Sequence, residues 1–262
     1  MKSFLRVTLF FTLALSAAST AEAKVKTEAI EYKDGNTVLE GYFAYDDAVK
    51  GKRPAILVVH EWLGPGPYSK KRAEQLAELG YLAFAVDMYG KDTRPKNHEE
   101  AAKVSGMYRS DRKLMRSRIT VGLERLKQHP MAEVSKIGVV GYCFGGTTAL
   151  ELARSGADVK AVATFHAGLD SPTPADGKNI KGKIMVFHGA DDGFVPAENV
   201  AAFQKELRDA KVDWQMVYFG GAVHSFTVAD AGNDPSKGMA YNAAADRRSW
   251  EAMKGFFSEA LK

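Results

Sequence analysis

Short apolar runs that alternate with segments of helical spacing restrict this chain to one kind of architecture. The apolar runs cover residues 54–60, 81–87, 137–140, 159–165, 183–188 and 214–218. Helical patterns lie between or after them, at 68–79, 98–128, 197–210 and 241–261, and from Gly141 through Ala153. The pattern at 98–128 is compatible with one helix or with two. Runs that are apolar on both faces are typical of strands in a parallel sheet covered by helices. The sequence therefore predicts an α/β fold with a mainly parallel sheet and helices on both faces.

Two β-like runs, residues 28–33 and 38–45, precede this alternation and are separated by Asp34-Gly35-Asn36. A turn of this composition between two strands predicts a β-hairpin. The length of 262 residues lies between the lengths typical of one-domain and two-domain proteins. We find no repeat and no linker, and the loop at 171–174 is too short to separate domains. The expected organisation is a single domain spanning residues 24–262.

Composition excludes several classes of protein. With 45% hydrophobic and 26% charged residues, the chain has the composition of a soluble globular protein. The 36 basic and 32 acidic residues are spread without long runs, so no concentrated basic face for nucleic acid is expected. One cysteine rules out an intramolecular disulfide framework and a zinc site built from cysteines. No metal and no organic cofactor is implied.

The amino terminus, residues 1–23, has the pattern of a signal peptide. Lys2 and Arg6 flank the start of an apolar stretch over 7–17, and small residues follow up to Ala21-Glu22-Ala23. This ending has the form of a signal-peptidase site. The apolar stretch is well short of the roughly 20 residues that span a bilayer, which argues against a membrane anchor. We expect an exported protein, periplasmic or secreted, that is free of the membrane after cleavage.

The segment Gly141-Tyr142-Cys143-Phe144-Gly145-Gly146 lies directly between an apolar strand and a helix. It has the form of the nucleophile elbow of α/β-hydrolases, with cysteine at the nucleophile position. Glycines are needed two residues before and after the nucleophile because a Cβ there would collide with the neighbouring strand and helix. A helix amino terminus also favours a thiolate. An inert buried cysteine is the alternative, but this context favours Cys143 as the nucleophile.

An elbow nucleophile requires an acid and then a histidine later in the chain. His224 lies in a loop after the last strand and is the only histidine downstream of the candidate acids. Asp191 and Asp192 are neighbours in the loop that follows residues 183–188, and both can also serve as turn or capping residues. We favour Asp192, which precedes the Val-Pro that opens the next helix, and expect Asp191 to shape the turn.

The segment His60-Glu61-Trp62 follows the first long strand, where this architecture places the second oxyanion donor. The backbone N–H groups of Trp62 and Phe144 are therefore the expected oxyanion hole. Glu61 is then expected to point toward Cys143. A carboxylate that caps the following helix is the alternative for Glu61.

With these residues and motifs, the chain resembles the dienelactone hydrolase family of α/β-hydrolases. The resemblance runs from about Lys26 to the end, through H-E-W-L-G, D-M-Y-G, G-Y-C-F-G-G, D-G-F-V-P and H-S-F. It implies Cys143 as nucleophile, His224 as base and Asp192 as its orienting acid. It also implies that Glu61 hydrogen-bonds the resting thiol and helps to activate it, and that Trp62 and Phe144 supply the oxyanion N–H groups.

The chain departs from the family pattern where two arginines hold the carboxylate of the substrate. Lys91 and Val228 occupy these positions. Lysine keeps a charge without the guanidinium fork, and valine keeps neither. Arg247 and Arg248 are expected to face solvent from the closing helix. Lys91 is thus the one candidate for binding a substrate carboxylate, and neutral esters are expected to react at least as well as anionic ones.

The expected function is cysteine-dependent hydrolysis of a small ester or lactone through an acyl-enzyme on Cys143, by a monomer. One alternative is an exported esterase or thioesterase for small acyl groups that uses the same residues. The other is an exported binding protein of the same fold that has lost turnover. The presence of elbow, acid and base argues against that second alternative.

Overall fold

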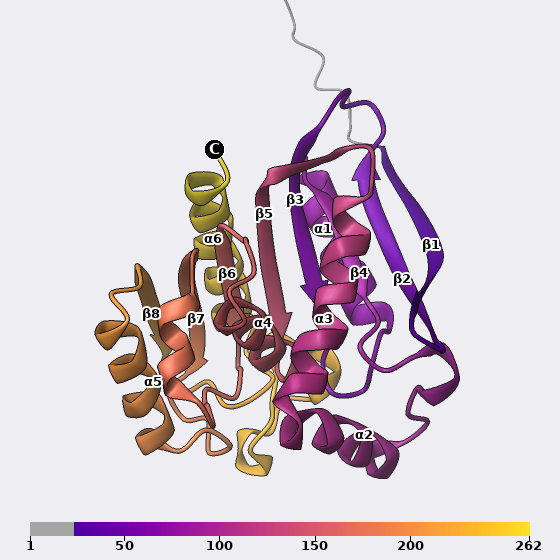
Figure 1. Cartoon of the computed structure of the whole chain (residues 1–262). Helices are drawn as coiled ribbons and strands as arrows, with labels where there is room; N and C mark the ends of the chain where they lie inside the picture. Colours follow the sequence, from indigo (N-terminus) through magenta and orange to yellow (C-terminus); the bar gives the residue numbers. More distant parts are fainter. Residues whose placement is uncertain (1–23) are drawn as a thin grey trace, which may run out of the picture.

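The computed structural model describes residues 24–262, and the predicted signal peptide, residues 1–23, lies outside the described residues. Eight strands form one sheet in the order β1-β2-β4-β3-β5-β6-β7-β8 (Figure 1). They are β1 (Val25–Asp34), β2 (Thr37–Asp46), β3 (Arg53–Val59), β4 (Leu82–Val86), β5 (Ala132–Tyr142), β6 (Ala161–Phe165), β7 (Lys183–Gly189) and β8 (Trp214–Phe219). Strands β3 to β8 are parallel, and the hairpin β1–β2 joins the sheet antiparallel to β4. The predicted hairpin and mainly parallel sheet are confirmed.

Helices cover both faces of the sheet, as predicted (Figure 1). They are α1 (Pro67–Glu78), α2 (His98–Ser110), α3 (Arg112–Lys127), α4 (Phe144–Arg154), α5 (Ala197–Asp209) and α6 (Ala243–Ala260). Helices α1 and α6 contribute to one buried apolar cluster, whereas α3, α4 and α5 contribute to the other. Short 3-10 turns were not predicted and occur at η1 (Lys91–Thr93), η2 (Pro174–Asn179), η3 (Ala229–Ala231) and η4 (Pro235–Lys237).

The two clusters explain why the central strands are apolar throughout. Along β3, Leu57 and Val59 pack into the cluster with α3 and α4, while Ile56 and Val58 pack into the cluster with α1 and α6. Successive side chains of a strand point to opposite faces, so a sheet covered on both sides requires an unbroken apolar run. The run at 54–60 in the sequence has this cause.

The segment 98–128 forms two helices because Asp111 interrupts it. The Asp111 carboxylate accepts a hydrogen bond from Leu114 N at 3.0 Å and caps α3. An aspartate at this position satisfies one of the N–H groups that a helix start leaves unpaired. The break places α2 below the sheet in Figure 1, at the end to which the arrowheads of β3 and β5 point.

Helix α4 follows the elbow and is buried along its whole length. At its last turn, Arg154 is fully buried and forms ion pairs with Glu151 at 2.9 Å and Glu206 at 2.7 Å. Buried charges are tolerated when they are paired and hydrogen-bonded, as these are. Arg154 thereby ties α4 to α5 on the same side of the sheet.

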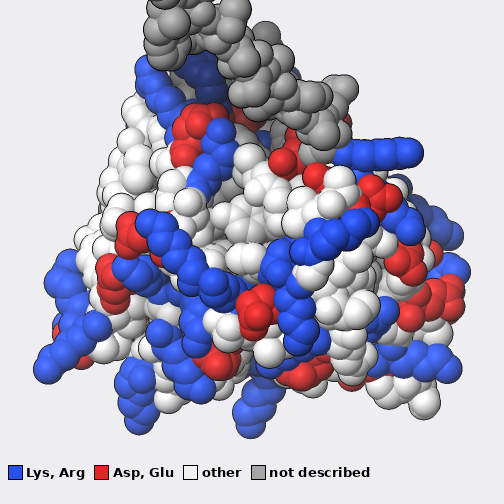
Figure 2. All heavy atoms as spheres, turned by 90° about the horizontal axis from the view of Figure 1, so that it is seen from above, with Lys and Arg blue, Asp and Glu red and all other residues white. Residues whose placement is uncertain are grey.

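The molecular surface carries charges of both signs. On the face seen in Figure 2, which lies at the other end of the molecule from α2, lysine and arginine side chains are intermingled with aspartate and glutamate. Within residues 24–262, no helix is both long and apolar enough to cross a membrane.

Candidate active site

Cys143 lies at the turn between β5 and α4, at the carboxyl end of the parallel strands. Its φ is 53°, in the left-handed region that non-glycine residues rarely adopt. A Cβ on Gly141 would lie 2.0 Å from the carbonyl oxygen of Gly145, and one on Gly145 would lie 2.3 Å from that of Val59. Side chains therefore do not fit at either position, which is the steric reason for glycines at this elbow.

The structure brings Cys143, His224 and Asp192 together in one hydrogen-bonded chain. Nε2 of His224 lies 3.1 Å from the Sγ atom of Cys143, and its Nδ1 lies 2.8 Å from Oδ2 of Asp192. The three residues come from the loops that follow β5, β8 and β7 respectively. The carboxylate can orient the imidazole, and the imidazole can exchange a proton with the thiol.

Asp191 and Asp192 have different surroundings although they are neighbours. The side chain of Asp192 is fully buried, and its second oxygen accepts a hydrogen bond from Phe194 N at 3.0 Å. Asp191 is exposed and accepts a hydrogen bond from Gly221 N at 3.0 Å, which links its loop to the turn before His224. The geometry thus places Asp192 against the histidine and leaves Asp191 with a role in the turn.

The surroundings of His224 favour its protonated form. Burial disfavours the charge, but the hydrogen bonds to Asp192 and Cys143 outweigh it and raise the pKa of His224 to about 10. A histidine that keeps its proton at neutral pH, next to a thiol, stabilises a thiolate.

Glu61 does not form the hydrogen bond to the thiol that the family resemblance implies. In the described part of the chain no hydrogen bond joins Glu61 to Cys143, because the thiol is turned toward His224 instead. Glu61 is partly buried near His224 and Arg72. Burial raises the pKa of Glu61 to about 7, although the charges of His224 and Arg72 act in the opposite direction.

The loop that carries Trp62 is held from β4. The hydroxyl of Tyr89 donates to the carbonyl oxygen of Trp62 at 2.8 Å, and Met88 N donates to Nε2 of His60 at 3.1 Å. His60 is buried, and this burial lowers its pKa to about 4, so it remains neutral. Among residues 24–262, no hydrogen bond of the loops and caps uses the N–H of Trp62 or Phe144. Both groups are available to a ligand.

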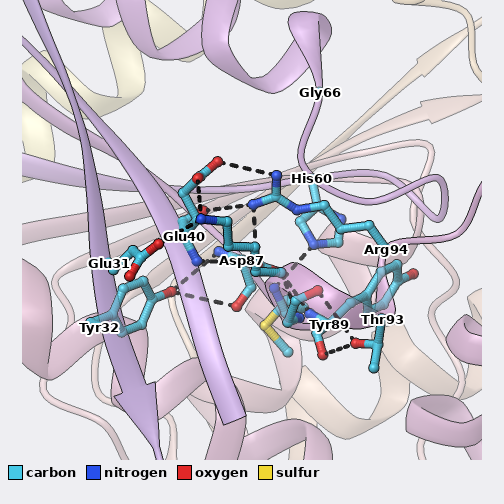
Figure 3. Close-up of polar contacts among 12 residues, drawn as sticks. Glu31, Tyr32, Glu40, His60, Gly66, Asp87, Tyr89, Thr93 and Arg94 are labelled. Atoms are coloured by element: carbon cyan, nitrogen blue, oxygen red, sulfur yellow. Dashed lines mark hydrogen bonds and ion pairs between the residues drawn. The ribbon is translucent and has the colours of Figure 1, made fainter.

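Asp87, directly after β4, organises this support (Figure 3). One carboxylate oxygen accepts from Tyr89 N and Gly90 N, each at 2.9 Å. The other lies 3.2 Å from Glu40 N and 3.3 Å from the guanidinium of Arg94. The turn after β4 is thereby fixed, and with it the Tyr89 hydroxyl that holds the Trp62 loop. The sequence analysis assigned no role to these residues.

A pocket of about 330 Å³ opens next to Cys143. Its lining is mostly apolar and consists of Trp62, Arg109, Cys143, Thr147, Gly168, Asp170, Phe194, Val195, His224 and Met239. The size suits a small ligand. The sequence analysis did not single out Arg109, which α2 brings to the pocket. Asp170 is ion-paired with Arg112 at 2.5 Å.

Lys91 lies away from this pocket, so its expected contact with a substrate carboxylate is not supported by its position. Its Nζ forms an ion pair with Glu31 at 2.6 Å on the exposed side of the β1–β2 hairpin. Val228 is partly buried and does not line the pocket either. Arg247 and Arg248 are exposed, as predicted.

No group of three or more His, Cys, Asp or Glu side chains within residues 24–262 is arranged to hold a metal ion.

The chain is similar to known proteins over most of its length. The model of the dienelactone hydrolase family matches residues 39–261. A crystal structure of a dienelactone hydrolase-like promiscuous phosphotriesterase from metagenomic libraries is 40% identical, with a TM-score of 0.86, over 91% of this chain and 99% of that one. A relative from Aquifex aeolicus named "Putative carboxymethylenebutenolidase" is 28% identical over 90% of this chain and 99% of its own.

Proposed function

The chain belongs to the dienelactone hydrolase family of carboxylic ester hydrolases, and from this premise we propose that it cleaves a small ester or lactone through a covalent acyl-enzyme on Cys143. The observation that carries the proposal is the contact of the only cysteine with a buried histidine, itself bonded to Asp192, in the lining of a mostly apolar pocket.

In the first half of the reaction, the Cys143 thiolate attacks the carbonyl carbon of the ester. The carbonyl oxygen becomes an oxyanion that accepts hydrogen bonds from the N–H groups of Trp62 and Phe144. When the carbon–oxygen bond breaks, the leaving alkoxide takes the proton of His224 and departs as an alcohol. The acyl group remains on Cys143 as a thioester, and His224 is neutral.

In the second half, neutral His224 takes a proton from water, which attacks the thioester carbonyl. The carbon–sulfur bond breaks, the carboxylic acid is released, and the thiolate faces a protonated His224 again. Asp192 stabilises the imidazolium in both halves through its bond to Nδ1.

The proposal is tested by hydrolysis of a panel of small esters, thioesters and lactones. We expect turnover by the wild type and its loss in Cys143→Ala, with the fold intact because only a sulfur atom at a turn is removed. Cys143→Ser should retain little activity, since a hydroxyl is a poorer nucleophile than a thiolate here. Iodoacetamide should inactivate at one equivalent, because the chain has one cysteine.

Wild-type turnover by Cys143→Ala would disprove the nucleophile. Alkylation of Cys143 without turnover of any ester, thioester or lactone would instead favour the binding-protein alternative.

We further propose that the protein is exported, which rests on the pattern of residues 1–23. Expression of the full chain in a bacterial host should yield a periplasmic or secreted protein that begins at Lys24. An intact amino terminus in the cytoplasmic fraction would contradict export.

A further inference from the structure

A second histidine, His166, is buried directly beside the imidazole of His224. It follows β6, is fully buried, and has a φ of 41°. The centroids of the two rings lie 5.3 Å apart with an interplanar angle of 64°. A buried residue kept in the left-handed region at a site is a reason to look for a function. None of the steps derived above uses His166.

The Nε2 atom of His166 is bound to the loop that carries His224. It lies 2.8 Å from the hydroxyl of Thr227, three residues after His224. The Thr227 hydroxyl also lies 2.6 Å from the hydroxyl of Tyr68, and the Thr227 carbonyl accepts from the Arg72 guanidinium at 3.3 Å. Thr227 is buried, so these contacts attach the loop to β6 on one side and α1 on the other.

The first member of this chain of hydrogen bonds has a fixed direction. A guanidinium can only donate, and Nε of Arg72 donates to the Tyr68 oxygen at 3.2 Å. Between Tyr68 and Thr227 either hydroxyl can donate, and Nε2 of His166 accepts from or donates to Thr227 according to its tautomer. The Nδ1 atom of His166 is buried without a hydrogen-bond partner in residues 24–262. Burial without a compensating partner favours the neutral form of the His166 ring.

We propose that His166 and Thr227 are positioning residues, which hold the His224 loop against Cys143 and keep the proton of the histidine pair on His224. The proposal rests on the proposed function, because its purpose is the thiolate–imidazolium pair of that reaction. Two imidazoles this close cannot both carry a charge at low cost, so a neutral His166 leaves the charge to the ring that faces the thiol.

The charged and titratable groups around the pair agree with this division. The groups that act on the two rings are Cys143, Asp192, Glu61, Arg72 and His188, with Tyr68 and Tyr142 packed behind them. Burial and then the charges of His224 and Arg72 hold the pKa of His166 well below its ordinary value. For His224, the hydrogen bonds to Asp192 and Cys143 act in the opposite direction and raise its pKa.

The experiment compares Thr227→Val with a matched control, Thr164→Val. Thr164 is also fully buried, two residues before His166, but its hydroxyl has no hydrogen-bond partner in residues 24–262. For each variant of the full chain we would measure the iodoacetamide alkylation rate from pH 5 to 11, together with kcat and KM for an ester that the wild type turns over.

Thr227→Val should raise the pH midpoint of alkylation by about one unit, because the thiolate loses a well-placed imidazolium. It should lower kcat about tenfold or more with little change in KM, as expected when a reacting group is displaced. Thr164→Val should keep the wild-type midpoint. Thr227→Ser, which restores the hydroxyl, should return the midpoint toward that of the wild type.

Tyr68→Phe provides a second route if Thr227→Val does not fold, since it removes the hydroxyl that contacts both Thr227 and Arg72 but leaves Thr227 itself in place. It should shift the midpoint in the same direction. The proposal is overturned if Thr227→Val, or Tyr68→Phe in its place, alkylates with the same profile as Thr164→Val. It is also overturned if Thr227→Ser behaves like Thr227→Val. Alkylation needs no substrate, so a wild type that hydrolyses nothing refutes the proposed function while this comparison still decides the role of Thr227.

Discussion

At the scale of single residues, the chemistry depends on which side chain each loop turns inward. Asp191 and Asp192 differ by one position, yet only Asp192 is buried against His224. The backbone explains the selection: Asp192 N donates to Gly189 O at 3.1 Å and Val195 N donates to Asp192 O at 3.3 Å, a tight turn that directs the second carboxylate inward.

We expect Asp192→Asn to reduce kcat/KM far more than Asp191→Asn, by about a hundredfold against less than about threefold. The amide retains the shape of Asp192 but loses the charge that stabilises the imidazolium. The measurement is kcat/KM for one ester with both variants, each checked by its melting temperature. A larger loss in Asp191→Asn would transfer the acid role to that residue.

The raised pKa of His224 predicts the pH dependence of acylation. His224 must donate its proton to an alkoxide leaving group, and its pKa of about 10 means that the proton is present at neutral pH and lost only as the pH rises through 10. For an alkyl ester, kcat/KM should therefore persist to about pH 9 and fall above it. Asp192→Asn should move this fall to lower pH, since the bond to Asp192 raises the pKa. A fall near pH 6.5 in the wild type would contradict the prediction.

At the scale of elements, the site is assembled where parallel strands end. The residues of the hydrogen-bonded chain follow β5, β7 and β8, and the Trp62 loop follows β3. Parallel strands direct all four loops to the same edge of the sheet (Figure 1). The close approach of α4 to the end of β3 completes the assembly. It is possible because Gly145 has no side chain, since a Cβ there would collide with the backbone of Val59 and His60.

Substitution of Gly145 tests this close approach, and Gly106 offers a matched control within α2. A Cβ at Gly145 would lie 2.3 Å from a backbone oxygen, whereas one at Gly106 meets nothing within 4 Å. Gly145→Ala should cost about 3 kcal/mol or more in the free energy of unfolding, through backbone displacement. Gly106→Ala should stabilise by roughly 0.5–1 kcal/mol through helix propensity. Urea denaturation of both variants measures the difference, and equal stabilities would disprove the steric role of Gly145.

At the scale of the whole molecule, the pocket is formed between helix α2, which contributes Arg109, and loops that follow the strands of the sheet. Its rim includes Phe194 and Met239, which are 59% and 36% exposed and offer apolar surface to a substrate. The exposed side chain of Arg109, from α2, places a positive charge in the lining of the pocket. Lys91 lies on another part of the surface, where it forms an ion pair with Glu31. We therefore expect Arg109, rather than Lys91, to influence the charge preference for substrates, and solvent to screen its effect.

We expect Arg109→Gln to lower the ratio of kcat/KM for an anionic ester over its neutral analogue by at most about fivefold, because an exposed charge contributes up to about 1 kcal/mol. Lys91→Gln should leave this ratio unchanged. In the wild type, the preference for the anionic ester should stay below about tenfold, or 1.4 kcal/mol. The comparison should be made at low and moderate salt. A tenfold anionic preference that Lys91→Gln abolishes would restore Lys91 to the site.

Local pattern was sufficient to predict the architecture and the order of the site residues along the chain. Apolar runs indicated the strands of the sheet, because burial on both faces leaves a continuous signal. The elbow at Cys143 was recognisable because sterics demand glycine on either side of it. The break at Asp111 and the placement of α2 were less evident, since capping competes with a helical pattern that continues through it.

Contacts between distant segments were decided only by the tertiary structure. The sequence alone favoured Asp192 on its spacing, but the turn that buries it depends on contacts with the neighbouring loop. Lys91 was misplaced because motif position does not reveal Glu31, sixty residues away. Arg109, the Asp87 cluster and the contact of His166 with Thr227 have no local signal, since each depends on how separate elements pack. The sequence by itself determined the elbow and the order of the candidate residues along the chain, because both are local patterns, whereas the packing of α1, α2 and the sheet decided which side chains surround them.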